Sequence, residues 1–216
     1  MVKILGEKNS ILNQFISEIR DVEIQKDSMR FRRNFERIGE IFAYEISKGL
    51  EYEVKEVYTP LGVAEVPVLK DFPVLATILR AGLPLHQGFL NMFDRSENAF
   101  VTAYRYHHKD GHFDIRVEYT SSPDLTDKIL IITDPMLATG ASLELSFKAL
   151  LEKGKPKHIH IVTVIASHEG VEFIKKKFPT STTTLWVGAV DDELTAQSYI
   201  VPGLGDAGDL AFGTKI

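Results

Sequence analysis

The sequence predicts an α/β domain with a mainly parallel central sheet flanked by helices. Short apolar runs typical of buried strands alternate with amphipathic helical segments through the second half of the chain. No linker rich in Gly, Ser or Pro divides the 216 residues, and 44% of them are apolar, which is enough for one sizeable core. We therefore expect residues 1–216 to form a single domain.

The first half of the chain combines one long helix with a small hairpin. A helix is predicted from about Asp27 to Lys48, because Asp27 can cap its first turn, apolar residues recur at helical spacing and Gly49 can end it. The runs EVKEVYTP (53–60) and GVAEVPVL (62–69) then predict an antiparallel hairpin.

Strands and helices alternate from residue 73 onward. The strand 98–106 is followed by turn residues at 109–111 and by the alternating run 112–120, which predicts a second hairpin whose tip lies in solvent. The other predicted strands are 73–79, 128–133, 158–166 and 182–190, and the predicted helices are 83–93, 142–153 and 170–178. In a sheet of this kind, ligands bind beyond the carboxyl ends of the strands.

Composition excludes several classes of function. The net charge of −5 and the pI near 5.8 provide no basic field for a polyanion, so we expect no nucleic-acid partner. The absence of cysteine excludes disulfides, thiolate nucleophiles and zinc–thiolate sites. The chain has no run of about 18 apolar residues, and its start lacks the apolar core of a secretory leader. We therefore expect a cytoplasmic protein with no membrane partner.

One loop has the composition of a phosphate cradle. In ILIITDPMLATGAS (129–142), four apolar residues bring Asp134 to the edge of the sheet, and Thr139, Gly140 and Ser142 lead into a helix. Amides at the start of a helix favour an anion, and the acid could reach the hydroxyls of a sugar carrying that phosphate. No Walker motif is present. The residues alone fit equally well a simple turn at Asp134 with Ser142 as a helix cap.

The carboxyl-terminal run YIVPGLGDAGDLAFGTKI (199–216) places Gly203, Gly205 and Gly208 on the spacing G-x-G-x-x-G. A dinucleotide-binding fingerprint needs a strand before the glycines, a helix after them, and an acid about 20 residues further on. Only the eight residues DLAFGTKI follow Gly208, and we expect them to form no helix, no return strand and no ribose-binding acid. The glycines therefore serve another ligand or none.

Several segments together resemble one enzyme family. ILIITDPMLATGAS (129–142) resembles the phosphoribosyl-pyrophosphate loop of type I phosphoribosyltransferases, and its DPMLATG is close to the uracil phosphoribosyltransferase version. YIVPGLGDAGD (199–209) is similar to the uracil-binding segment of that family. TILRAGLPL (77–85) resembles its pyrophosphate-contacting loop, and RRNFERIGEIFAYEIS (32–47) resembles its amino-terminal helix. The resemblance spans most of the chain, in order.

The resemblance implies a type I phosphoribosyltransferase-like fold, with the second hairpin as a lid and a small hood formed by the terminal segments. It implies transfer of ribose 5-phosphate from phosphoribosyl pyrophosphate to uracil, which gives UMP and pyrophosphate. The catalytic residues would be Asp134 facing the cationic sugar, Arg80 on pyrophosphate, and Arg105 closing over it from the hairpin. Contacts to phosphoribosyl pyrophosphate would come from Arg80, Arg105, Asp134, Pro135, Met136, Leu137, Ala138, Thr139, Gly140, Ala141, Ser142 and Asp206.

The same resemblance implies how the other ligands are held. Uracil would be contacted by Ile200, Gly205, Asp206 and Ala207, mainly through fixed backbone donors and acceptors. Mg²⁺ would be bound mainly by oxygens of phosphoribosyl pyrophosphate and pyrophosphate, with no dedicated protein ligands. A homodimer or a higher homo-oligomer is expected.

Three positions depart from the family pattern. Thr133 stands where related phosphoribosyltransferases have a second acid, although the uracil branch also tends to keep one acid. Ala141 replaces a more usual glycine in the cradle. Leu210 stands where the family usually has an arginine, which leaves open whatever that arginine contributes.

Two alternatives remain open at this point. One is a regulator of the same fold that senses uridine nucleotides and binds RNA, for which an arginine stripe at Arg30, Arg33 and Arg37 is a candidate surface; a solvated or subunit-facing surface is the favoured interpretation. The other is a phosphoribosyltransferase for a purine or for orotate, although orotate would need an extra cation beside the base. The histidines of 107–112 are interpreted as a solvated tip rather than as a metal site.

Overall fold

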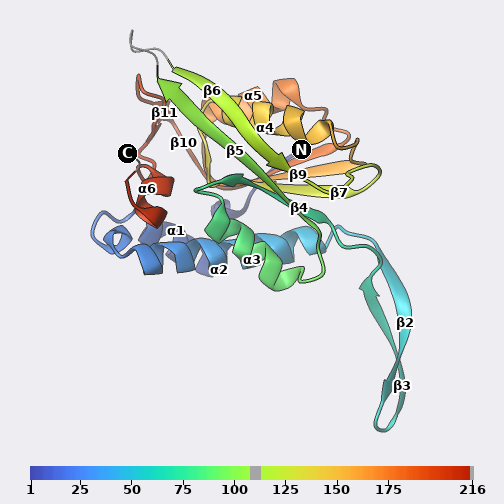
Figure 1. Cartoon of the computed structure of the whole chain (residues 1–216). Coiled ribbons are helices and arrows are strands. Elements are labelled where there is room, and N and C mark those ends of the chain that lie inside the picture. Colours follow the sequence, from blue (N-terminus) through green and yellow to red (C-terminus); the bar gives the residue numbers. More distant parts are fainter. Residues whose placement is uncertain (108–112, 215–216) are drawn as a thin grey trace.

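The computed structural model describes residues 1–107 and 113–214, and the side chains of 104–116 lie outside that description. Its centre is a sheet with strand order β1-β10-β9-β7-β4-β5-β6, to which the short β8 adds beside β9 (Figure 1). Neighbouring strands are parallel except β5 and β6, which confirms the predicted sheet. The strands are β1 (Val2–Ile4), β4 (Val74–Leu79), β5 (Asn98–His107), β6 (Phe113–Ser121), β7 (Ile129–Thr133), β8 (Met136–Leu137), β9 (His158–Ser167) and β10 (Thr183–Asp191).

Helices cover both faces of this sheet (Figure 1). Leu75 and Ile131 belong to one apolar cluster, whereas Ala76 and Ile132, their neighbours along the same strands, belong to another, as the alternation of a strand requires. The first cluster includes residues of α1 (Ile11–Arg20), α2 (Ser28–Ser47) and α3 (Leu83–Met92), and the second includes residues of α4 (Ala141–Leu151) and α5 (His168–Lys177). None of the described helices is both long and apolar enough to cross a membrane.

The long helix α2 begins where the sequence predicts. The Asp27 carboxylate accepts hydrogen bonds from the amides of Met29 (3.0 Å) and Arg30 (3.1 Å), which satisfies two of the unpaired amides of the first turn. The structure also contains β1 and α1, which the sequence analysis did not predict. The sequence feature that could have predicted α1 is the N-cap residue Ser10, whose hydroxyl accepts a hydrogen bond from the Leu12 amide at 3.3 Å. Two short 3₁₀ turns, Leu5–Glu7 and Ile24–Lys26, flank α1.

The expectation that no helix follows the terminal glycines is wrong. A short helix, α6 (Ala207–Phe212), begins before Gly208 rather than after it. Asp206 caps this helix by accepting the Asp209 amide at 3.0 Å, and Arg32 of α2 donates to the Ala211 carbonyl at 2.6 Å. Packing against α2 stabilises a helix that is too short to form alone. No strand follows α6 in the described residues, so the rejection of a dinucleotide fingerprint stands.

The predicted first hairpin is β2 (Tyr52–Thr59) and β3 (Gly62–Leu69), paired in register from Tyr52 with Leu69 to Thr59 with Gly62. It forms an arm that extends away from the sheet and its helices (Figure 1). All eight residues of β2 are exposed. The arm therefore has no partner within the described chain for most of its side chains.

Candidate active site

Asp134 lies directly after β7, at the carboxyl edge of the sheet. Its amide donates to the Val162 carbonyl at 3.0 Å, and its Oδ1 accepts a long bond of 3.5 Å from the Met136 amide. Burial raises the pKa of Asp134 to about 7, and the Met136 amide opposes that rise only in part. The carboxyl group is therefore poised to ionise when a positive charge approaches it.

The loop after Asp134 enters α4 through Gly140. Gly140 has a φ of +83°, and a Cβ there would lie 2.5 Å from the ring of Phe173, so both the backbone and the packing require glycine. The Ser167 hydroxyl holds the loop two residues before Gly140 by donating to the Ala138 carbonyl at 2.6 Å. Because α4 starts at Ala141, Ser142 lies inside the helix and is not its cap. The interpretation of Ser142 as only a helix cap is therefore wrong.

Three predicted cradle residues face inward. The Pro135 carbonyl accepts the amides of Val164 and Ile165, each at 3.1 Å. The side chain of Leu137 is buried in the core on the α4 and α5 side, and Met136 packs partly against the opposite cluster. A phosphate bound by this loop would therefore be contacted by the segment Ala138–Ser142, whose residues other than Gly140 are partly exposed.

The turn after β4 lies beside the end of β7. The Thr77 hydroxyl donates to the Thr133 carbonyl at 3.4 Å. A Cβ on Gly82 would meet that same carbonyl at 3.2 Å and the Thr77 hydroxyl at 2.1 Å, so glycine permits this close approach. The loop that carries Arg80 and the loop that carries Asp134 are thus neighbours.

The terminal segment closes onto the Arg80 loop. Arg80 Nη2 is 3.0 Å from Asp209 Oδ1 and donates to the Gly213 carbonyl at 3.1 Å. A Cβ on Gly208 would lie 3.8 Å from Ala81 Cβ. The Asp134 loop, the Arg80 loop and the terminal segment therefore meet, although they are far apart in the sequence. The family resemblance assigns these three segments to three parts of one reaction. The sequence analysis did not include Asp209, because nothing in the chain pairs it with a residue 129 positions away.

The residues assigned to the base form a short strand and a helix start. β12 (Ile200–Val201) pairs with β11 (Glu193–Leu194), and the Ile200 side chain is buried. Gly205 has a φ of +94° and Asp206 caps α6, so the backbone between them is fixed. This arrangement suits recognition by backbone groups.

Comparison with known proteins decides the family. A family model described as uracil phosphoribosyltransferase matches residues 7–214. A uracil phosphoribosyltransferase of Porphyromonas gingivalis is 60% identical over 98% of both chains. The one from Pyrococcus furiosus is 36% identical over 97% of this chain and 89% of its own. The chain belongs to the uracil phosphoribosyltransferase family. A solved protein from Aquifex aeolicus shares 30% identity and a TM-score of 0.87, with 100% of both chains covered.

The roles assigned to Asp134, Arg80 and Arg105 stay predictions, and for Arg105 the side chain is not described. Arg105 lies in β5, where its backbone pairs with Ile115 of β6, and its side chain lies outside the described residues. The antiparallel hairpin predicted as a lid is present as β5 and β6. Residues 108–112, which contain the predicted tip and two of its histidines, also lie outside the described residues.

The main departure from the uracil phosphoribosyltransferase pattern has a structural setting. Leu210 lies on α6 and packs partly against the core shared by α1, α2 and α3. Its neighbour Asp209 already has a cation in Arg80. The leucine thus fills an apolar position in this chain.

The arginine stripe of α2 is occupied by pairs within the chain. Arg30 contacts Glu18 at 2.9 Å, Arg33 contacts Glu36 at 2.6 Å, and Arg37 donates to Asn34 Oδ1 at 3.2 Å. These contacts fit the expected solvated or packed surface and give no support to an RNA-binding face. In the part of the chain that the structure describes, no three His, Cys, Asp or Glu side chains gather as a metal site.

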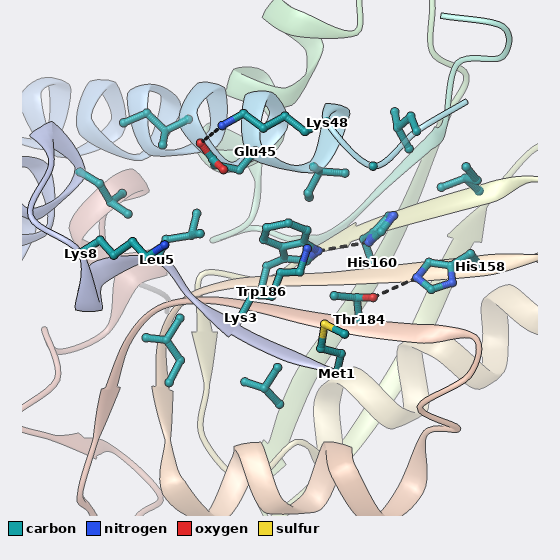
Figure 2. Close-up of a pocket in the computed structure, with 18 of the residues that line it drawn as sticks. Met1, Lys3, Leu5, Lys8, Glu45, Lys48, His158, His160, Thr184 and Trp186 are labelled. Carbon is teal, nitrogen blue, oxygen red and sulfur yellow. Dashed lines mark hydrogen bonds and ion pairs between the residues drawn. The ribbon is translucent and has the colours of Figure 1, made fainter. Parts of the chain in front are cut away.

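A large cavity of about 1230 Å³ lies at the opposite, amino end of the sheet, between the last turns of α2 and the first residues of β9 and β10. Trp186 Nε1 donates to His160 Nδ1 at 3.1 Å on its floor, and Lys3 lies 4.1 Å from the Trp186 ring (Figure 2). Burial, with the charges of His158 and Lys3, lowers the pKa of His160 to about 3, so its ring is neutral. Parallel sheets bind substrates at their carboxyl ends, which favours the Asp134 end of the sheet over this cavity as the candidate site.

Proposed function

We propose that this chain transfers ribose 5-phosphate from phosphoribosyl pyrophosphate to uracil. A bond forms between N1 of uracil and the anomeric carbon, the bond from that carbon to the pyrophosphate oxygen breaks, and N1 loses its proton. The observation that carries the proposal is the meeting of the three predicted loops, with Gly82 against Thr133 and Arg80 against Asp209. Family membership supports the same reaction.

The cradle and Asp134 act on the phosphoribosyl group. Amides and hydroxyls from Ala138 to Ser142 hold the 5-phosphate at the start of α4, where the helix dipole favours negative charge. Asp134 binds the ribose hydroxyls. As pyrophosphate leaves, positive charge develops on the sugar, and the ionised carboxylate stabilises it.

Arg80 acts on the leaving group. In the structure its guanidinium contacts Asp209 and the Gly213 carbonyl, and pyrophosphate would compete for the same planar fork. Arg105 closes over pyrophosphate from the β5–β6 hairpin and helps to exclude water. The backbones of Ile200 and of Gly205 to Ala207 read the edge of uracil, with Asp206 near the phosphoribosyl group.

Magnesium fits the donors that are present. Mg²⁺ prefers oxygen ligands and usually keeps few protein contacts; the described residues include no cluster of three metal-ligating side chains, so phosphate oxygens of the substrate would be its main ligands. When bound, it would neutralise charge on the pyrophosphate. The side chains described above still bind the substrates and orient them.

A panel of bases tests the proposed reaction. The protein is mixed with phosphoribosyl pyrophosphate, Mg²⁺ and uracil, hypoxanthine, guanine, adenine or orotate, and both pyrophosphate and the nucleotide are measured. We expect rapid turnover with uracil alone, because the terminal segment offers backbone groups and its described residues, 199–214, include no cationic side chain for the orotate carboxylate. Equal turnover with hypoxanthine or orotate would refute the assignment.

We also propose that the protein is a homodimer or a higher homo-oligomer. The arm carries exposed apolar side chains on one face, among them Val54, Tyr58 and Val63. Glu56 and Glu65 lie directly opposite each other on that same face, an arrangement that destabilises an isolated hairpin. A second subunit that covers the apolar residues and supplies a cation would remove both costs.

A further inference from the structure

A partly buried ion pair outside the predicted site holds the segment assigned to uracil. Arg20, the last residue of α1, makes a two-pronged contact with Asp191, the last residue of β10, with nitrogen–oxygen distances of 2.7 and 2.8 Å. Arg20 Nη1 also donates to the Gly203 carbonyl at 2.9 Å, and the Gly203 amide donates to Asp191 Oδ2 at 2.8 Å. The Arg20–Asp191 pair therefore fixes both the amide and the carbonyl of Gly203.

The Arg20–Asp191 pair is largely shielded from solvent. Asp191 is 7% exposed, and the side chain of Arg20 is 22% exposed. Burial alone would raise the pKa of Asp191, but hydrogen bonds from Arg20 and Gly203 outweigh it and lower that pKa below its usual value. The carboxylate is thus ionised near neutral pH and can hold its partners by charge-assisted bonds, which are the stronger kind.

Gly203 is a position where the chain needs external support. Its φ is +57°, and a Cβ there would lie 2.1 Å from the Ile200 carbonyl, so the chain doubles back tightly between Ile200 and Gly205. When its amide is oriented to match its neighbours, Gln25 also donates to the Leu204 carbonyl at 2.9 Å. The turn that separates the two groups of base-contacting backbone is therefore held from α1 and the segment that follows it.

We propose that Arg20 and Asp191 are positioning residues for uracil. The proposal rests on the proposed function, because it assigns the base to Ile200 and to Gly205–Ala207. The pair has no contact with the base in this assignment. It fixes the turn at Gly203, so that the backbone groups on both sides of the turn stay at the spacing of one uracil edge.

The experiment compares two arginines that make the same kind of contact. Arg20→Met removes the fork and keeps the apolar stem. Arg30→Met is the matched control, because Arg30 makes a similar bidentate contact with Glu18, at 2.9 and 3.0 Å, and has no hydrogen bond or ion pair with the terminal segment as far as residue 214. We expect Arg20→Met to raise the KM for uracil about tenfold or more, with the KM for phosphoribosyl pyrophosphate changed less than about threefold. Arg30→Met should leave both constants near those of the unaltered chain.

Hydrogen–deuterium exchange gives a readout that does not depend on activity. Amides of residues 199–206 should exchange faster in Arg20→Met than in Arg30→Met, because only the former loses the hydrogen bond to the Gly203 carbonyl and the cation that orients Asp191. Unchanged exchange there, or faster exchange with an unchanged KM for uracil, would overturn the proposal. An unaltered chain that makes no UMP would instead contradict the proposed function. Where Arg20→Met does not fold, Arg20→Lys gives the same comparisons, since it keeps the charge and loses the fork.

Discussion

At the scale of single residues, the position proposed for catalysis, Asp134, costs stability. An aspartate in solution has a pKa near 3.8, and burial raises the pKa of Asp134 to about 7. Between these values the folded chain retains a proton that the unfolded chain has lost, so stability falls as the pH rises from about 4 to about 7. Above pH 7 the folded chain holds a half-buried, ionised carboxylate whose desolvation has little compensation. That unfavourable charge is available to a cationic transition state.

Asp134→Asn is therefore expected to change activity and stability in opposite directions. Turnover should fall by about 100-fold or more, because the neutral amide cannot stabilise the charge that develops on the sugar. The free energy of unfolding without substrates should rise by about 2 kcal/mol at pH 8 and be nearly unchanged at pH 4, where both side chains are neutral. Activity assays and urea unfolding at the two pH values measure these effects.

A surface aspartate provides the control for this experiment. Asp192 follows β10 and its side chain is 88% exposed. Asp192→Asn should alter the free energy of unfolding by less than about 0.5 kcal/mol at either pH. Equal turnover in the Asp134→Asn and unaltered chains would mean that Asp134 only shapes the turn after β7.

At the scale of elements, the crossing of α2 and α3 depends on two glycines. A Cβ on Gly39 would lie 2.4 Å from the Leu85 carbonyl, and a Cβ on Gly88 would lie 2.0 Å from the Glu36 carbonyl. These neighbours are backbone atoms, which cannot move aside as a flexible side chain can. The two helices therefore approach more closely than alanine allows, and α3 in turn follows directly from the turn that carries Arg80.

Gly39→Ala is expected to destabilise the fold although alanine favours helices. The intrinsic gain of about 1 kcal/mol is outweighed by separation of the helices, for a net loss of about 1–2 kcal/mol. Gly49→Ala is the control, because a Cβ there meets only the Ile46 carbonyl, at 3.7 Å. Thermal unfolding of both variants measures the difference. A Gly39→Ala variant as stable as Gly49→Ala would show that the helices can separate at no cost.

At the scale of the whole molecule, the arm formed by β2 and β3 has exposed apolar side chains that a single subunit does not pack. Tyr58 is 81% exposed and Leu61 fully exposed, at the end of a two-stranded hairpin that extends away from the domain. Two-stranded hairpins are marginally stable in water without packing. The proposed second subunit would provide the packing that the chain lacks.

The double variant Tyr58→Ser with Val63→Ser tests that proposal. These side chains lie opposite each other on one face of the arm, so their loss removes apolar area from a single contact surface. Light scattering after size-exclusion chromatography should show an oligomer for the unaltered chain and a smaller assembly for the variant. Tyr119→Ser, an exposed tyrosine on β6, should leave the mass unchanged. A monomeric unaltered chain would contradict the proposed homo-oligomer.

The sequence by itself determined the parallel sheet, the long helix α2, both hairpins, the cradle loop and the family. Each of these depends on local periodicity or on a contiguous motif, such as the helical spacing after Asp27 or the run 129–142. Only the tertiary structure decided that Arg80 pairs with Asp209, 129 residues away, and that Arg20 holds Gly203, 183 residues away. It also decided that α6 forms at all. These features depend on contacts between distant segments, and no local pattern records which segments the sheet brings together.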